Sequence, residues 1–455
     1  MSNRLKKKTR RNYFENSVRE GFDLGMESEM SFVKSVNIPN QNSVFPQHQR
    51  RIKLYEYEFL KTFLYALHTG VLSNPKLSID NFNALASNSN PVIVAPDIVG
   101  TDENGLSIVE NHSVFVNLKY RKSSYQLTVY VLAMQDGPFN VLKYFISVLG
   151  IEPDSFRTIE LVEFLIKESV KNSYYKNKIL SVICDDEERI DINQVKEDKF
   201  KNEDLKDLFI PDNVKEELER FYECVDSYDV IGLGLRYLLC GEPGTGKTKS
   251  VRTLINMCHK KATIIIAEGE IDFRALFDFA SMFEPAILCI DDIDLLIGSR
   301  DRSFSPNSLG ALLQELDGFD KNNIFLLTTT NDKELIDKAA SRPGRFDMVI
   351  DYNKINKNNY LELIKSYCST PQVNEVIDES ILATLQKNKI TGAYLVNLIK
   401  QLEIKYKLDP DCDMREYIRN LITLTYRGFY KNTEEKQLSF GFGNYDSNGI
   451  EVIDL

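Results

Sequence analysis

The sequence predicts an α/β protein in which a parallel sheet flanked by helices is followed by a helical lid and preceded by an α+β domain. Short apolar runs alternate with helical segments from 237 to 351, the pattern turns helical from 356 to 426, and strand-like and helix-like spacings mix before residue 198. Such alternation of strands and helices is typical of a parallel sheet covered on both faces.

Length and composition bound the function. The 455 residues suffice for roughly two to four domains. A formal net charge of -11 argues against a surface built to coat nucleic acid. The 7 cysteines lie apart without metal-ligand spacing, which favours a reducing, cytoplasmic location. No apolar run reaches the roughly 18 residues that cross a bilayer, so no transmembrane segment is expected.

The chain begins with a basic segment, residues 1–12. A solvated, disordered tail is one interpretation. A site for nucleic acid, anionic lipid or an acidic partner is the alternative.

Residues 13–198 are predicted to form the α+β amino-terminal domain, which we expect to recruit a partner. Segments 114–118 and 125–134 are rich in β-branched and aromatic residues and predict a β-hairpin. Apolar spacing predicts helices at 139–149 and 158–170.

A short strand is expected at 178–183, and the charged stretch 185–204 is expected to contain an exposed linker that ends this domain. Residues 199–355 then form the large α/β part, 356–430 the lid and 431–455 a polar, acidic tail. The large part should contain five buried strands, at 237–240, 263–266, 286–290, 324–328 and 348–351.

A phosphate-binding loop follows the first of these strands. The run matches GxxxxGK[ST] and stands between a strand and a helical segment, as this motif requires: Gly241, Glu242, Pro243, Gly244, Thr245, Gly246, Lys247 and Thr248. Glycines let backbone N–H groups curl around phosphates at the positive end of the following helix. We expect Lys247 to contact the β and γ phosphates of ATP and Thr248 to ligate Mg²⁺.

A second acidic signal supports the same chemistry. The apolar strand 286–290 ends in Asp291 and Asp292, which places Asp291 at the carboxyl edge of the sheet, beside the phosphate loop. Asp291 is the expected magnesium ligand.

Several segments in order resemble the AAA ATPases. Residues 276–294 are similar to the family's LFxxAxxxxPxIxxIDEID, 316–319 to its MDGF turn and 341–347 to its LRPGRFD box. Residues 207–218 resemble its DIGGLxxVKxEL entry, with Phe209 and Ile210 replacing its glycines, and 391–395 resemble its GADL lid start. The resemblance covers about half of the chain and implies a P-loop AAA+ domain.

The resemblance also implies roles for further residues. Asn331 falls at the sensor 1 position, while Leu208, Gly392 and Ala393 fall where the family contacts adenine. Arg342 and Arg345 would stabilise charge on the ATP of a neighbouring subunit. That arrangement requires a head-to-tail homo-oligomer, and hexameric rings are usual in the family.

Two departures from the family stand out. Asp292 replaces the glutamate that polarises the attacking water and is one methylene shorter, so slow hydrolysis is one outcome and full hydrolysis the other. Only residues 267–272 separate the strand at 263–266 from the next helix, which leaves no room for the usual pore loop. This short segment locally resembles Bcs-type AAA proteins, which move folded substrates. We expect Phe273 to have a packing role.

Three functions remain open from the sequence. The first is a ring ATPase that remodels, assembles or disassembles a folded protein partner. The second is a nucleotide-gated scaffold with little turnover. The third is a nucleic-acid-handling ATPase, suggested by the basic start and by Arg50, Arg51 and Lys53.

Overall fold

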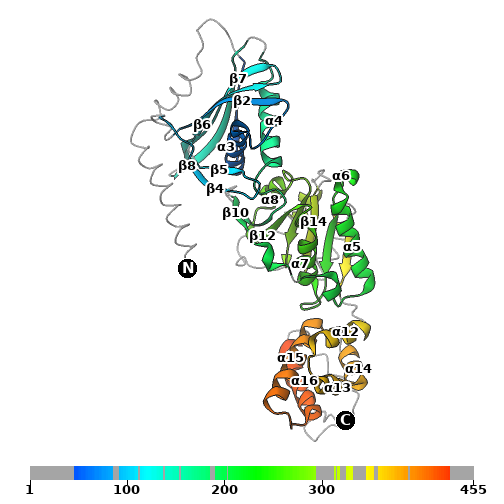
Figure 1. Cartoon of the computed structure of the whole chain (residues 1–455). Coiled ribbons are helices and arrows are strands. Elements are labelled where there is room, and N and C mark those ends of the chain that lie inside the picture. Colours follow the sequence, from blue (N-terminus) through cyan, green and yellow to red (C-terminus); the bar gives the residue numbers. More distant parts are fainter. Residues whose placement is uncertain are drawn as a thin grey trace. The chain divides into compact units, whose positions relative to one another are not determined.

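In a computed structural model, the chain divides into two compact units, with the boundary between Lys176 and Asn177 (Figure 1). It describes residues 46–85, 92–110, 113–136, 139–152, 155–184, 190–201, 203–293, 312–313, 315–317, 324–331, 345–352, 357–387 and 390–430. Among these, no helix combines the length and the apolar character needed to cross a bilayer. The predicted tails at 1–12 and 431–455 lie outside the described residues.

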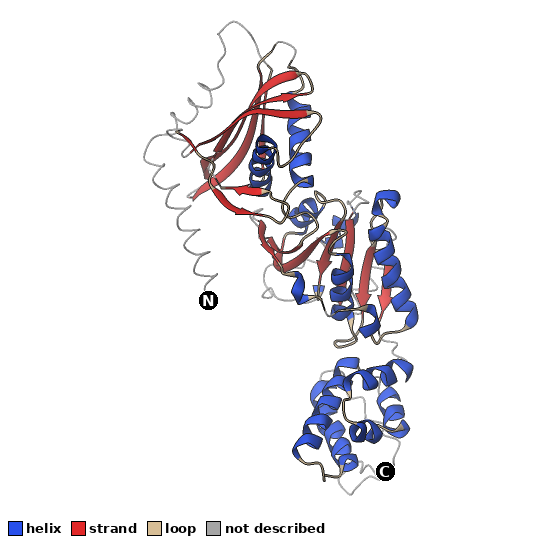
Figure 2. Cartoon of the chain, viewed as in Figure 1, coloured by secondary structure: helices blue, strands red, loops and turns tan. Residues whose placement is uncertain are grey.

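The first unit is built on a six-stranded antiparallel sheet with the order β1-β8-β7-β6-β2-β3 (Figure 2). Its strands are β1 (Gln47–Ile52), β2 (Leu77–Leu85), β3 (Ile93–Val94), β6 (Ser113–Tyr120), β7 (Ser123–Asp136) and β8 (Phe139–Gly150). A separate pair joins β4 (Ile98–Thr101) to β5 (Ser107–Val109). The helices α3 (Leu54–Thr69) and α4 (Thr158–Lys171) pack on this sheet.

Alternation along the central strands explains the core of this unit. In β6, Val114, Val116 and Leu118 are buried and pair with buried residues of β7. Side chains at every second position point to one face, so these residues form the layer beneath the helices. The hairpin predicted at 114–134 is confirmed, as is the helix at 158–170.

The helix predicted at 139–149 is wrong, because this segment is the strand β8. It pairs antiparallel with β7 on one side and with β1 on the other. Ile146 and Leu149 point to opposite faces and both are buried. A strand buried on both faces gives a continuous apolar run, which fits a helical spacing equally well.

The second unit contains a seven-stranded sheet with the order β10-β9-β12-β13-β14-β11-β15. Its strands are β9 (Ile179–Cys184), β10 (Ile190–Gln194), β11 (Arg236–Cys240), β12 (Thr263–Ile271), β13 (Ala286–Ile290), β14 (Ile324–Thr330) and β15 (Met348–Asp351). All neighbouring strands are parallel except β10 and β9. The five strands predicted for the large part are confirmed.

The predicted domain boundary after residue 198 needs correction. Strand β9 pairs with β12, and β10 continues the same sheet, so both belong to the second unit. Phe200, in the stretch expected to contain an exposed linker, is buried in the core of this unit. Pairing between strands some 80 residues apart leaves no local mark in the sequence, so the charged stretch predicts a boundary that is too late.

Helices cover this sheet: α5 (Asp212–Asp226), α6 (Tyr228–Ile231), α7 (Lys247–Cys258) and α8 (Phe273–Ala280), with short turns η1 (Glu197–Lys199) and η2 (Leu205–Asp207) before them. Leu218 of α5 and Leu254 of α7 share one core with Leu239 of β11. Leu238, the next residue of β11, points to the other face and is also buried. Both faces are therefore covered, as the alternating pattern predicted. Phe273 is buried, which confirms its packing role.

The lid consists of α12 (Lys357–Tyr367), α13 (Pro371–Val376), α14 (Glu379–Lys387), α15 (Gly392–Leu408) and α16 (Met414–Tyr430), which share one apolar core. The described residues of the range 356–430 are thus mainly helical, as expected for this part of the chain.

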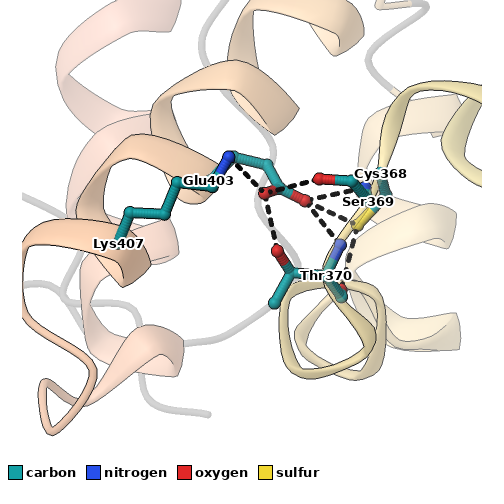
Figure 3. Close-up of polar contacts among 5 residues, drawn as sticks. All are labelled: Cys368, Ser369, Thr370, Glu403 and Lys407. Carbon is teal, nitrogen blue, oxygen red and sulfur yellow. Dashed lines mark hydrogen bonds and ion pairs between the residues drawn. The ribbon is translucent and has the colours of Figure 1, made fainter.

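A buried carboxylate, Glu403 of α15, holds the start of α13 (Figure 3). The backbone N–H groups of Ser369 and Thr370 each donate to it at 2.8 Å, and their hydroxyls donate at 3.0 and 2.6 Å. Although burial acts to raise the pKa of Glu403, the hydrogen bonds from Thr370 and Ser369 lower it to about 2. This carboxylate satisfies donors at a helix start that have no partner within their own helix.

Candidate nucleotide-binding site

The order of three adjacent strands brings the predicted site together. Strand β14 lies between β11 and β13, and their registers align Cys240 with Thr330 and Ile290 with Thr328. The next residues along the chain are Gly241, Asn331 and Asp291. Since carboxyl ends of parallel strands share one edge of the sheet, these residues meet there.

The phosphate loop leaves β11 and turns into α7. Gly244 has a φ of 82° and Gly246, the residue before α7, has a φ of 107°. Such values favour glycine, because a Cβ would clash with the backbone. The Thr245 hydroxyl donates to the carbonyl of Glu242 at 2.8 Å and closes the turn. The predicted loop therefore stands directly before the positive end of a helix.

Lys247, the first residue of α7, is buried and reaches across the loop. Its Nζ donates to the carbonyls of Gly241 at 2.7 Å and Glu242 at 2.9 Å, and to Oδ1 of Asn331 at 2.8 Å. One ammonium group thus links the phosphate loop to the end of β14. A cation at this point is suited to polyphosphate.

The second half of the site is acidic. The Thr248 hydroxyl donates to Oδ1 of Asp291 at 3.2 Å, and Nδ2 of Asn331 donates to Oδ1 of Asp292 at 3.2 Å. Mg²⁺ prefers oxygen ligands such as hydroxyls and carboxylates. In proteins this ion usually binds one or two carboxylates together with the phosphates of a substrate. Thr248 and Asp291 fit this donor set. Among the described residues, no group of three or more His, Cys, Asp or Glu offers another metal site.

Asp292 adopts an unusual backbone conformation. Its φ is 47°, in the left-handed region that costs a residue with a Cβ roughly 1 kcal/mol, less for Asp than for most. Its N–H donates to the Thr329 hydroxyl at 2.7 Å, and that hydroxyl donates to Oδ1 of Asp291 at 2.5 Å. Sequence reasoning missed Thr329, since a threonine within a β-branched strand gives no functional signal.

The entry segment joins the two parts of the second unit. Leu208 is buried in the core of the large part, whereas Phe209 packs against the lid core. A Cβ placed on Gly246 would lie 3.5 Å from Ile210, and the Ile210 carbonyl accepts from Nδ2 of Asn359 in α12 at 2.9 Å. The adenine contact expected of Leu208 stays a prediction.

The start of the lid helix α15 lies against the phosphate loop. The N–H of Ala393 donates to the Gly244 carbonyl at 3.0 Å, and a Cβ on Gly244 would stand only 2.7 Å from that of Ala393. Gly392 is near the same carbonyl. These two residues thus lie beside the phosphate loop, and their contact with adenine stays a prediction.

Arg345 is held within its own chain. Its Nε and Nη2 donate to the two carboxylate oxygens of Asp317, each at 2.7 Å, and the residue is 7% exposed. This hydrogen bonding to Asp317 raises the pKa of the guanidinium above its ordinary value. Arg342 lies outside the described residues. The expected action of the two arginines on a neighbour's ATP is untested.

Comparison with known proteins agrees with this geometry. Residues 237–354 match the model of the family described as "ATPase family associated with various cellular activities (AAA)". The chain is 33% identical over 215 residues to the chloroplastic ATP-dependent zinc metalloprotease FTSH 7 of Arabidopsis thaliana, covering 42% of this chain and 27% of that protein.

Two yeast proteins, from Saccharomyces cerevisiae, show similar matches. The mitochondrial inner membrane i-AAA protease supercomplex subunit YME1 is 30% identical over 204 residues, or 42% of this chain and 27% of YME1. The ribosome biogenesis ATPase RIX7 is 30% identical over 195 residues, or 39% of this chain and 23% of RIX7. The chain thus spans about a quarter of the length of these relatives. Residues 237–354, which include the phosphate loop and the strands β13 and β14, are thus similar to the AAA family of ATPases.

Proposed function

We propose that this protein binds MgATP at the edge formed by β11, β14 and β13, hydrolyses it, and uses the energy to remodel a protein partner. The observation that carries the proposal is the convergence of Lys247, Asn331, Asp291 and Asp292 through hydrogen bonds of 2.8 to 3.2 Å and the shared Thr329 hydroxyl. Each type of group that ATP hydrolysis needs is present: a cation, a magnesium ligand and a carboxylate for the water.

Each residue has a distinct part in this proposal. Lys247 contacts the β and γ phosphates, and backbone N–H groups of the loop surround them. Thr248 and Asp291 hold Mg²⁺, which neutralises phosphate charge when bound. Asp292 accepts a hydrogen bond from the attacking water, and Asn331 orients that carboxylate.

Oligomerisation follows if the arginines act between subunits. Arg342 and Arg345 would reach the ATP of a neighbour in a head-to-tail ring, for which we propose six subunits. Arg345 would then give up at least part of its bidentate contact with Asp317. The names of the relatives, which include a protease subunit and a ribosome biogenesis ATPase, support a macromolecular partner.

The partner we propose is folded rather than threaded. Strand β12 continues to Ile271, with a bulge after Ala267 and a φ of 75° at Gly269, and Ile271 pairs with Cys184 of β9. Asp272 then accepts from the N–H of Ala275 and caps α8. The segment where AAA proteins that thread polypeptides carry a pore loop is therefore bonded to the sheet. Proteolysis is outside the proposal, because the sequence contains no H-E-x-x-H zinc motif.

A nucleotide-gated scaffold is the second candidate, and the geometry of Asp292 favours it. This carboxylate is shorter than the family's glutamate, its backbone is left-handed, and Asn331 already donates to it. Positioning errors of about 1 Å can cost about 100-fold in rate. A cytoplasmic location and a nucleic-acid partner remain predictions.

The proposal is tested by measuring the rate of phosphate release with MgATP for the wild type, Lys247→Ala and Asp292→Glu. The particle mass is determined under the same conditions. Release that depends on Lys247 supports the ATPase. ATP-dependent rings without release, and release regained in Asp292→Glu, would replace it with the scaffold. ATP affinity unchanged in Lys247→Ala by calorimetry would overturn the site.

A further inference from the structure

Thr329 contacts the carboxylate of Asp291 and the backbone N–H of Asp292, and it lies outside the motifs described above. It is the sixth residue of β14 and is fully buried. Its hydroxyl donates to Oδ1 of Asp291 at 2.5 Å and accepts from the N–H of Asp292 at 2.7 Å. One side chain on β14 therefore contacts two consecutive residues at the end of β13.

We propose that Thr329 is the positioning residue of this acidic pair: its hydroxyl sets the carboxylate of Asp291 for Mg²⁺ and holds the backbone of Asp292 in the conformation that aims its side chain. This inference rests on the proposed function of the site. It assigns to Thr329 no contact with nucleotide.

The hydrogen bonds around Asp291 explain the first half of the role. Oδ1 of Asp291 accepts hydrogen bonds from two hydroxyls, that of Thr248 at the start of α7 and that of Thr329. Two donors from different elements fix the rotation of the carboxylate. Such outer contacts orient metal ligands, and their loss typically costs about 10- to 100-fold in metal affinity or activity.

The backbone of Asp292 explains the second half. A φ of 47° is unfavourable for a residue with a Cβ and persists only where surrounding contacts hold it. The bond from the Asp292 N–H to Thr329 is such a contact, and the bond from Asn331 to the Asp292 carboxylate is another. Without the Thr329 hydroxyl, the backbone N–H of Asp292 loses its hydrogen bond, and the direction of the Asp292 carboxylate changes.

The preceding residue supplies a matched control. Thr328 is also fully buried in β14, and its hydroxyl has no hydrogen-bond partner among the described residues. Thr→Val keeps the shape of the side chain and replaces the hydroxyl with a methyl group. Thr328→Val and Thr329→Val thus make the same chemical change one residue apart.

The experiment compares the full-length wild type with Thr329→Val, Thr329→Ser and Thr328→Val. Steady-state phosphate release gives kcat and KM, and calorimetry gives ADP affinity in Mg²⁺ and in EDTA. For Thr329→Val we expect kcat to fall about 10- to 100-fold and the Mg²⁺ needed for half-maximal ADP affinity to rise about 10-fold. Affinity in EDTA should not change, and Thr329→Ser should restore both values to within about 3-fold.

Equal behaviour of Thr329→Val and Thr328→Val would overturn the inference, as would an equal loss of ADP affinity with and without Mg²⁺. If Thr329→Val does not fold, Thr329→Ala against Thr328→Ala makes the same comparison. A wild type without phosphate release would contradict the ATPase proposal only, because the Mg²⁺ dependence of ADP affinity still tests Thr329.

Discussion

Two groups of hydrogen-bonded carboxylates in the second unit look alike in chemistry and differ in construction. Glu403 receives four short hydrogen bonds from the consecutive residues Ser369 and Thr370. Asp291 and Asp292 receive theirs from side chains on separate elements: Thr248 on α7, Thr329 on β14 and Asn331 just after β14.

The difference separates a structural acid from a functional one. The donors to Glu403 include two backbone N–H groups at the start of a helix, so this carboxylate stabilises the fold of the lid. Around Asp291 and Asp292 the donors are hydroxyl and amide side chains; of these, Thr248 belongs to the phosphate-loop motif and Asn331 contacts its Lys247. Substitutions should therefore separate activity from stability.

The largest effect is expected at Asp291. Asp291→Asn removes the charge that binds Mg²⁺, so phosphate release should fall by at least about 100-fold. The free energy of unfolding should change by less than about 1 kcal/mol, because the substitution also removes the repulsion between the negative charges of Asp291 and Asp292. Urea denaturation alongside the ATPase assay measures both. If Asp291→Asn lost stability in proportion to activity, Asp291 would be a structural acid like Glu403, and the distinction between the two sites would be wrong.

Glu403→Gln should show the reverse. The neutral amide offers one acceptor oxygen where two carboxylate oxygens served four donors, so we expect unfolding to become easier by about 2 kcal/mol. Phosphate release by the folded protein should stay within about 3-fold of the wild type. Lys407→Ala is the control, since its Nζ stands 3.8 Å from Glu403 and its side chain is 68% exposed, and it should change little.

Gly244→Ala should sharpen the contrast at the contact of loop and lid. A Cβ here would stand 2.7 Å from that of Ala393, in addition to the cost of a φ of 82°. Gly232→Ala is the matched control, because its φ is 65° and nothing lies within 4 Å of its Cβ position. Gly232→Ala should cost about 1 kcal/mol in stability, and Gly244→Ala should cost more, because its Cβ also forces Ala393 to shift. Only Gly244→Ala should weaken nucleotide binding, by roughly 10-fold. Equal nucleotide affinities in calorimetry would contradict the proposed docking of α15.

The smallest effect concerns the stability of the lid, which should depend on Glu403 ionisation only under acidic conditions. Glu403 has a pKa of about 2 in the folded chain against an ordinary value of 4.5, so the unfolded chain binds its proton first. Its contribution is complete above about pH 4.5 and disappears as the pH falls toward about 2. Denaturation of the wild type across this range should show a steeper loss than Glu403→Gln. Parallel pH profiles would show that Glu403 does not carry the difference.

Local patterns predicted much of the second unit and less of the first. The strands of the phosphate-loop sheet are short, apolar and bounded by motifs, and their predicted positions agree with β11 to β15. Strand β8 fits a helical spacing as well as a strand, because both of its faces are buried. Strand β9 pairs with β12, which is distant in the sequence, and β10 joins the sheet through β9, so local patterns do not reveal the unit to which these two strands belong.

The sequence by itself determined the phosphate loop, the acidic end of β13, the asparagine after β14 and the helical lid, because each depends on residue order within one segment. Only the tertiary structure decided that Thr329 joins the two aspartates, that Arg345 pairs with Asp317, that Ala393 meets Gly244 and that Glu403 caps α13. These contacts join residues 28 to 149 positions apart or in different elements, and their geometry is set by the packing of strands and helices rather than by any spacing along the chain.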